Sequence, residues 1–192
     1  MTADIHAVSS LEVAVKRLEK SGFYWGAISG IKAKAVLRDQ AVGTFLVRDS
    51  SESRHLFTIS LVTSVGVTNV RIVFLEGLFS LDKKDTSKTT TNKELHHCGP
   101  PKFDCVVKMA FYYMLVTRKI LQARGRSSLD ELETKGTAKF FLWRPLYKEF
   151  ASLQHLCRKA LNNQLLAGGS KEDAKSIPHT VKFFLSKYPY PI

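Results

Sequence analysis

The sequence lacks the marks of a secreted or membrane-spanning protein. It holds three cysteines, Cys98, Cys105 and Cys157, and an odd, small number favours reduced thiols over a disulfide framework. No apolar run approaches the roughly 20 residues that a transmembrane helix needs. Residues 1–6 show no basic patch followed by an apolar stretch, so no signal peptide is expected. These absences predict a cytoplasmic protein.

Acidic residues are scarce relative to basic ones. The chain of 192 residues has 29 lysines and arginines against 17 aspartates and glutamates, a net charge of +12. A nucleic-acid-binding protein gathers such charge on one face, whereas here it is spread along the whole chain. The densest run, Lys83 to Lys93, also contains an acidic residue, Asp85, and a threonine tract. We therefore expect no nucleic acid among the partners, and interpret the charge as solubility and affinity for some anion.

Helical spacing of apolar residues recurs along the chain. The capping-box pair Ser9 and Glu12 predicts the start of a helix that continues to Lys20. Ser29 can cap a second helix. Further helices are expected at residues 103–114, 152–161 and 181–188.

Alternating apolar and polar residues predict a sheet in the first half of the chain. Turn residues separate the alternating segments, as antiparallel hairpins require. We expect loops at 82–101 and 124–137, a short apolar stretch at 138–146 and a domain boundary at 147–151. The pattern predicts an α+β fold with strands at 43–50, 55–63, 69–75 and 78–81.

Arg48 is the strongest candidate for a binding residue. It follows an apolar strand, where a guanidinium is partly desolvated and needs an anion. The polar turn at 49–53 offers hydroxyls and backbone N–H groups suited to phosphate. Thr58 and Arg71 lie on the less apolar face of their strands and converge with Arg48 if all three share a face. An internal ion pair of Arg48 with Asp49 or a glutamate would explain the same pattern equally well.

Two motifs resemble a known family. Trp25-Gly26 and the segment 43–50 resemble the start and the phosphate-binding strand of an SH2 domain, and 55–60 and 69–72 continue the pattern. The segment 152–158 resembles the opening of a SOCS box. Because both occur in the family's order, the chain is identified as a member of the suppressor of cytokine signalling family, which includes the cytokine-inducible SH2 protein.

The resemblance implies three parts. Residues 1–22 would hold an N-terminal segment and an extended SH2 helix. Residues 23–147 would form the SH2 domain, an antiparallel sheet flanked by two helices. Residues 148–192 would form a helical SOCS box.

The resemblance also implies a phosphotyrosine pocket. Arg48 would bind the phosphate with both arms of its guanidinium. Gly30 stands where SH2 domains often carry a second phosphate-binding arginine, so Arg71, with Lys32 as a further candidate, would supply the additional charge. The pocket would be completed by Ser50, Ser51, Thr58 and Arg71.

The helix predicted at residues 152–161 carries an apolar stripe. By default, such a stripe packs on the chain's own domain. The resemblance implies instead that it binds Elongin C, and with it Elongin B. Ile177 and Pro178 begin the motif implied to contact Cullin-5 and its RING partner, and Thr180 replaces that motif's second proline, which predicts weaker cullin binding. The stripe consists of Leu153, Leu156, Cys157 and Leu161.

The implied function is non-catalytic. The chain would be the phosphotyrosine-binding substrate receptor of an Elongin–cullin ubiquitin ligase that restrains cytokine receptor (JAK-STAT) signalling. The alternative is an SH2 adaptor that only competes for receptor phosphotyrosine.

An enzyme or a metal protein is disfavoured, and no cofactor is expected. His97-Cys98-Gly99 resembles a cysteine phosphatase loop but lacks the arginine that should follow it. His96, His97, Cys98 and Cys105 lack the paired spacing of a zinc site.

Overall fold

The computed structural model describes residues 2–82, 100–123, 140–149, 152–167 and 177–192, with side chains from Leu11 onward. The predicted loops at 82–101 and 124–137 lie largely outside these residues, as do His96, His97 and Cys98. The chain divides into two compact units, Met1–Lys148 and Glu149–Ile192, which are described separately. Within the described segments, no helix is long and apolar enough to cross a membrane.

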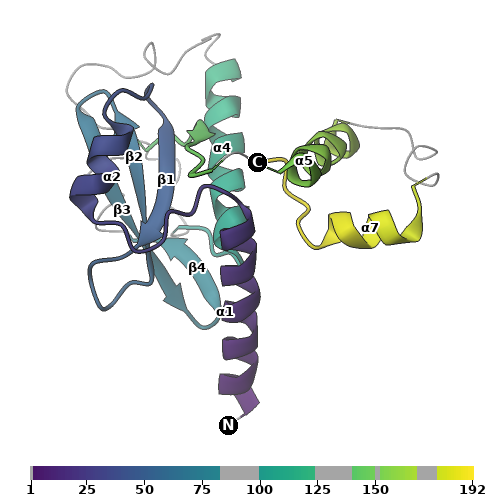
Figure 1. Cartoon of the computed structure of the whole chain (residues 1–192). Helices are drawn as coiled ribbons and strands as arrows, with labels where there is room; N and C mark the ends of the chain where they lie inside the picture. The colour runs from purple at the N-terminus through teal and green to yellow at the C-terminus, as the bar shows by residue number, and fades with distance from the viewer. Residues whose placement is uncertain (1, 83–99, 124–139, 150–151, 168–176) are drawn as a thin grey trace. The chain divides into compact units, whose positions relative to one another are not determined.

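The first unit is built on a five-stranded sheet in the order β4-β3-β2-β1-β5 (Figure 1). The first four strands pair antiparallel in chain order, which confirms the four predicted strands. The fifth was predicted only as part of an apolar stretch, and it pairs with β1 in parallel. The strands are β1 (Thr44–Asp49), β2 (Phe57–Thr63), β3 (Gly66–Leu75), β4 (Leu78–Leu81) and β5 (Arg144–Pro145).

A tight turn joins β3 to β4. Glu76 and Gly77 have φ angles of 54° and 76°, so both central residues are left-handed. Two-residue hairpins favour this geometry because its twist matches that of the flanking strands. The turn sets the register that places Phe74 opposite Phe79.

Helices lie on both sides of the sheet. α2 (Gly30–Leu37) is capped by Ser29, whose hydroxyl accepts a hydrogen bond from the N–H of Lys32 at 3.1 Å, as predicted. α2 covers one side of the sheet, and α4 (Val106–Ala123) lies on the other side and contacts α1 (Thr2–Lys20) (Figure 1).

The bounds of α1 and α4 differ from the prediction. The predicted start at Ser9 is wrong, because α1 begins at Thr2 and Ser9 lies within it. Residues 2–8 contain no glycine or proline, so the helix can continue past the capping-box pattern. α4 extends to Ala123 rather than Met114, and the buried Leu121 in its last turns packs near Phe141.

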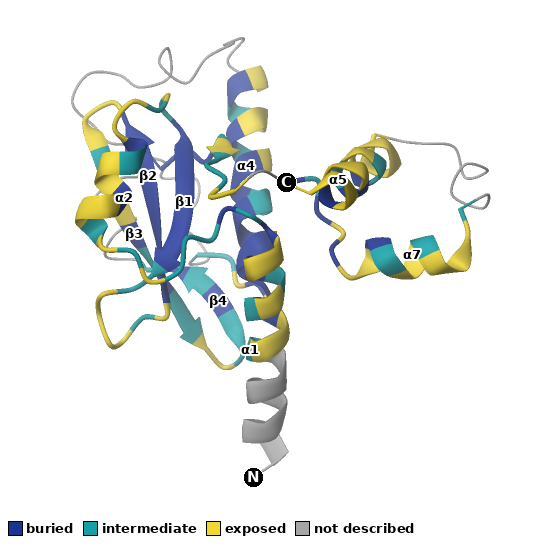
Figure 2. Ribbon diagram, viewed as in Figure 1, coloured by how far each residue is buried: buried dark blue, intermediate teal, exposed yellow. Residues whose placement is uncertain are grey.

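The sheet is buried on both faces over most of β1 and β2 (Figure 2). On the α2 side, Ala33 and Leu37 pack against Leu46 and Val62. This apolar layer covers one end of the sheet. Arg48 lies two residues after Leu46 on β1, so its side chain is on the same face of the sheet. At Arg48 this face therefore changes from apolar to polar side chains.

The second unit contains α5 (Leu153–Leu166), α7 (His179–Ser186) and the C-terminal segment 187–192. The helices predicted at 152–161 and 181–188 are therefore present, with shifted ends. Asn162 ties the C-terminal segment to α5, because its Nδ2 lies 2.8 Å from the carbonyl oxygen of Tyr188 and 3.4 Å from that of Tyr190. Among the residues of the unit that the structure describes, the buried ones are Leu185, Tyr188, Tyr190 and Ile192 together with His155, Arg158 and Asn162.

Candidate functional site

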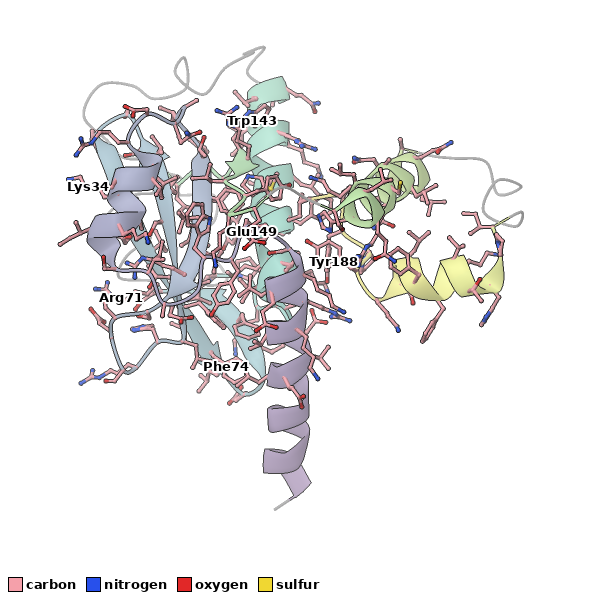
Figure 3. The ribbon with its side chains drawn as sticks, in the orientation of Figure 1. Lys34, Arg71, Phe74, Trp143, Glu149 and Tyr188 are labelled. Carbon is pink, nitrogen blue, oxygen red and sulfur yellow. The ribbon has the colours of Figure 1, made fainter. Side chains whose placement is uncertain are left out.

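Arg48, Thr58 and Arg71 lie in one row across three neighbouring strands. Arg48 on β1 is opposite Thr58 on β2, and Thr58 is opposite Arg71 on β3. Directly opposed residues of antiparallel strands point their side chains to the same face. Figure 3 shows Arg71 on the α2 side of the sheet, where it shares a side with Lys34. The structure therefore brings the two guanidiniums and the threonine hydroxyl to one face.

The guanidinium of Arg48 is buried, with only 4% of the residue exposed. Its Nε donates to Ser60 Oγ at 3.1 Å, one terminal nitrogen donates to the carbonyl oxygen of Asp49 at 2.9 Å, and the other donates to Asn69 Oδ1 at 3.3 Å. All three acceptors are neutral. Burial lowers the pKa of Arg48, and the positive charge of Arg71 lowers this pKa further.

The internal ion pair with Asp49 is not the arrangement found. Tyr24 donates its hydroxyl hydrogen to the carboxylate of Asp49, and Arg48 bonds only to the backbone carbonyl of that residue. Within the described part of the chain, no carboxylate forms an ion pair with Arg48. A buried charge of this kind is costly, and an external anion would offset the cost.

The turn after β1 holds the predicted serines. The hydroxyl of Ser50 accepts a hydrogen bond from the N–H of Glu52 at 3.1 Å, and the N–H of Ser50 donates to the carbonyl of Leu56 at 3.0 Å. Ser51 is exposed. The turn is thus closed by its own hydrogen bonds next to the row of Arg48, Thr58 and Arg71.

Ser60 and Asn69 were not predicted as site residues. Ser60 Oγ donates to Asn69 Oδ1 at 2.6 Å, and both side chains accept hydrogen bonds from Arg48. The sequence carried a weak signal, since Ser60 and Asn69 lie two residues from Thr58 and Arg71 on their strands and so share their face. Only the register, Ser60 opposite Asn69, shows that they meet at Arg48.

Gly30, the first residue of α2, lies beside the same guanidinium. A Cβ built on Gly30 would stand 3.4 Å from Nη2 of Arg48, an ordinary van der Waals distance. A side chain at position 30 would therefore project next to the pocket. Lys32, the further candidate, is exposed on the same helix.

The second candidate surface is the outer face of α5. Leu153 is 77% exposed and Leu156 is 49% exposed, Cys157 is exposed, and Leu161 is half-buried. Polar side chains take the inward face, where Arg158 lies over the rings of Phe184 and Tyr188, at 4.4 Å and 5.2 Å from their centroids. The apolar stripe therefore lies largely on the surface.

The remaining predicted residues lie at the start of α7 and in the first unit. Ile177 is half-buried, and Pro178 is exposed and forms the N-cap of α7. Cys105, from the disfavoured zinc cluster, is buried in the first unit. Across the residues that the structure describes, no group of three or more histidines, cysteines or acids could hold a metal ion.

Residues 23–96 match the SH2 domain family. The chain is 36% identical over 184 residues to Suppressor of cytokine signaling 3 of Gallus gallus, an alignment that covers 93% of this chain and 82% of that protein. It belongs to the suppressor of cytokine signalling family. The family prediction and the predicted SH2 fold are thereby confirmed.

Other members of the suppressor of cytokine signalling family have a similar sequence identity to this chain. Suppressor of cytokine signaling 3 of Homo sapiens is 33% identical over 201 residues, covering 93% of this chain and 84% of that protein. Suppressor of cytokine signaling 2 of Homo sapiens is 37% identical over 152 residues, covering 79% and 69%. Among solved structures, the SH2 domain of a Monosiga brevicollis CRK/CRKL homologue is similar with a TM-score of 0.41 and 23% identity, covering 66% of this chain and 88% of that one.

Membership in the family sets the general role of the chain. SH2 domains recognise phosphorylated peptides with clusters of arginines. The chain is thus assigned to the negative regulators of cytokine signalling that bind phosphotyrosine through an SH2 domain.

Proposed function

We propose that the chain is a substrate receptor, which binds a phosphotyrosine through Arg48 and recruits an Elongin–cullin ubiquitin ligase to the phosphorylated protein. In this role it acts in the cytoplasm and catalyses no reaction itself. The observation that carries the proposal is the buried guanidinium of Arg48, which is held by three neutral acceptors. The outer face of α5 supports the recruitment step.

The pocket suits a phosphate for an electrostatic reason. A doubly charged phosphate can accept hydrogen bonds from both arms of an arginine, and such charge-assisted bonds are about twice as strong as neutral ones. Arg71 adds a second positive charge in the same row, and Thr58 adds a hydroxyl. Ser50 and Ser51 in the adjoining turn would complete the ligand set.

The exposed stripe on α5 suits a protein partner. Burying a leucine side chain contributes about 1.5–3 kcal/mol, so leaving Leu153 and Leu156 exposed forgoes several kcal/mol. Apolar patches of this kind mark partner surfaces. We assign the stripe to Elongin C, which would bring Elongin B, and we assign Ile177 and Pro178 to Cullin-5 with its RING partner.

Recruitment would act through proximity. One end of the chain holds the phosphorylated protein, and the other holds the ligase, so the ubiquitin-charged enzyme meets its target at a high effective concentration. This arrangement needs both surfaces on one chain, and we assign the first role to the pocket of the first unit and the second to the stripe of the second unit.

Thr180 favours the second candidate function, competition without ligase recruitment. It replaces the second proline of the implied cullin motif, and it lies in the first turn of α7. If cullin binding fails, the chain would act by occupying the receptor phosphotyrosine alone. Capture of Elongin B and C but not Cullin-5 from co-expressed components would support this alternative.

The pocket is tested by changing Arg48 to lysine, which keeps the charge and loses the planar fork. We expect retention on an immobilised mixture of phosphotyrosine peptides to fall at least tenfold, with little change in the melting temperature. Arg38→Lys, at the exposed C-cap of α2, is the matched control. Equal retention of the Arg48→Lys variant and the parent would show that the pocket lies elsewhere.

The recruitment step is tested by co-expression with Elongin B and C. The full chain should co-purify with both. A chain that binds phosphotyrosine and does not capture the Elongins would be an adaptor.

A further inference from the structure

Glu52 lies beside the pocket and forms an ion pair with Arg71. The turn after β1 holds it in place, because its N–H donates to Ser50 Oγ at 3.1 Å and its carbonyl accepts from the N–H of His55 at 3.1 Å. The second carboxylate oxygen of Glu52 lies 3.5 Å from Nδ1 of His55. The two oxygens thus face Arg71 and His55.

His55 and Asp82 extend this contact on the far side. Nε2 of His55 lies 3.3 Å from Oδ2 of Asp82, and the N–H of Asp82 donates to the carbonyl of Arg71 at 2.9 Å. Glu52 is therefore a carboxylate in a defined position, held by its own turn and by the side chain of Arg71 from β3, while Asp82 contacts His55 and the backbone of Arg71.

The two arginines of the pocket consequently differ in their partners. Arg48 is buried and held by neutral groups, whereas Arg71 is partly exposed and bound to a carboxylate. A phosphate that bound both arginines would compete with no carboxylate for Arg48 among the residues that the structure describes. At Arg71 it would meet Glu52.

We propose that Glu52 is an internal competitor for the phosphate, an affinity-determining residue that occupies Arg71 until a bound phosphate displaces it. The proposal rests on the proposed function of the pocket. The displacement exchanges one anion for another on Arg71. Arg71 therefore contributes less to phosphate binding than its charge alone would suggest.

Removing the charge of Glu52 should therefore tighten binding. Exposed ion pairs are worth about 0.2–1 kcal/mol, which corresponds to an affinity gain of up to about fivefold. Salt screens such exposed charges, so the gain should shrink as the ionic strength rises. A residue that merely held Arg71 in position would give the opposite sign, because its loss would weaken binding.

The test uses the full chain and phenyl phosphate, followed by chemical-shift changes in NMR at low and high salt. Glu52→Gln should bind about two- to fivefold more tightly than the parent at low salt, with a smaller gain at high salt. Glu12→Gln is the matched control: it removes the same charge from an exposed ion pair with Lys16 on α1. Glu52→Ala serves as a second variant if Glu52→Gln lowers the melting temperature.

A double variant tests whether Glu52 acts through Arg71. In an Arg71→Gln background, Glu52→Gln should give a markedly smaller gain, because the competition has been removed. Unchanged or weaker binding by Glu52→Gln would overturn the proposal, as would an equal gain from Glu12→Gln. The proposed function would stand in these cases provided that Arg48→Lys still lost binding. If the parent chain itself bound no phenyl phosphate, the proposed function would fail instead.

Discussion

Arg48 on β1 and Asn69 on β3 meet across the intervening strand, with Nη2 of Arg48 3.3 Å from Oδ1 of Asn69. The same oxygen accepts the hydroxyl hydrogen of Ser60 at 2.6 Å. The orientation of the guanidinium therefore depends on two uncharged residues of other strands, Ser60 on β2 and Asn69 on β3.

Replacing Asn69 with alanine should weaken phosphotyrosine binding. A hydrogen bond contributes about 0.5–1.5 kcal/mol, so the loss of this orienting bond should lower the affinity about two- to tenfold. Titration with phenyl phosphate measures the change, and Asn163→Ala, at an exposed position on α5, is the control. Unaltered affinity in Asn69→Ala would mean that Ser60 and the Asp49 carbonyl suffice to orient Arg48.

Replacing Gly30 with arginine should strengthen phosphotyrosine binding. A Cβ at this position fits at 3.4 Å from Arg48, so the added side chain can project toward a bound phosphate. We expect an affinity gain of about two- to fivefold, since a partly exposed ion pair contributes about 1 kcal/mol or less. The melting temperature of the unliganded chain should fall slightly, because the new charge lies near Arg48. Ile31→Arg adds the same charge one residue further along α2, and an equal gain there would point to a general effect of charge.

Introducing charge into the α5 stripe should abolish Elongin capture. Leu153→Asp combined with Cys157→Asp would force carboxylates into an apolar interface, which costs several kcal/mol. Co-purification with Elongin B and C measures the loss, and retention on phosphotyrosine peptides should stay unchanged. Leu166→Asp, at another exposed position of the same helix, is the control and should still capture the Elongins.

The exposed stripe also predicts an effect of the partner on stability. A partner that binds only the folded state stabilises it. Co-expression with Elongin B and C should therefore raise both the soluble yield and the melting temperature. Equal yield and equal melting temperature with and without the Elongins would favour the adaptor.

The stability of the second unit should fall in mild acid because of His155. Its ring is buried edge-on against Tyr188, with centroids 5.6 Å apart, and neither ring nitrogen has a hydrogen-bond partner among the described residues. Burial lowers the pKa of His155, and the charges of Arg158 and Lys159 lower it further. The unfolded chain, with a histidine pKa of about 6.5, therefore takes up the proton first as the pH falls.

The stabilising contribution of neutral His155 is thus complete above about pH 6.5 and is lost as the pH drops toward the folded-state pKa. Hydrogen exchange of α5 at pH 7.5 and pH 5.5 measures the difference. His155→Gln should reduce this dependence, whereas His179→Gln, which removes an exposed histidine, should retain it. The same pH dependence in both variants would assign the effect to other groups.

Local patterns in the sequence were enough to predict the strands and most helix positions. The alternation in β1 to β3 and the Ser29 cap depend on residues close together in the chain, so they can be recognised without the fold. The start of α1 was missed because a capping-box pattern at Ser9 can also occur inside a helix. β5 was missed because a two-residue parallel strand has no periodicity of its own.

In the candidate pocket, too, some residues could be predicted from local sequence patterns and others could not. Arg48 could be selected because a charged residue that follows an apolar strand needs a partner. Ser60, Asn69 and Glu52 could not be assigned in this way, because their contacts with Arg48 and Arg71 depend on the pairing of distant strands and on the path of the turn.

The sequence by itself determined the family, the order of the elements and the residue types available for binding a phosphate, since these follow from local patterns and motifs. The tertiary structure decided which groups surround Arg48, that Arg71 is bound to Glu52, and that the polar residues of α5 face inward while Leu153 stays exposed. The physical reason is that strand register and helix packing set the distances between residues far apart in the chain, and these distances determine whether a charge meets a neutral acceptor, a carboxylate or solvent.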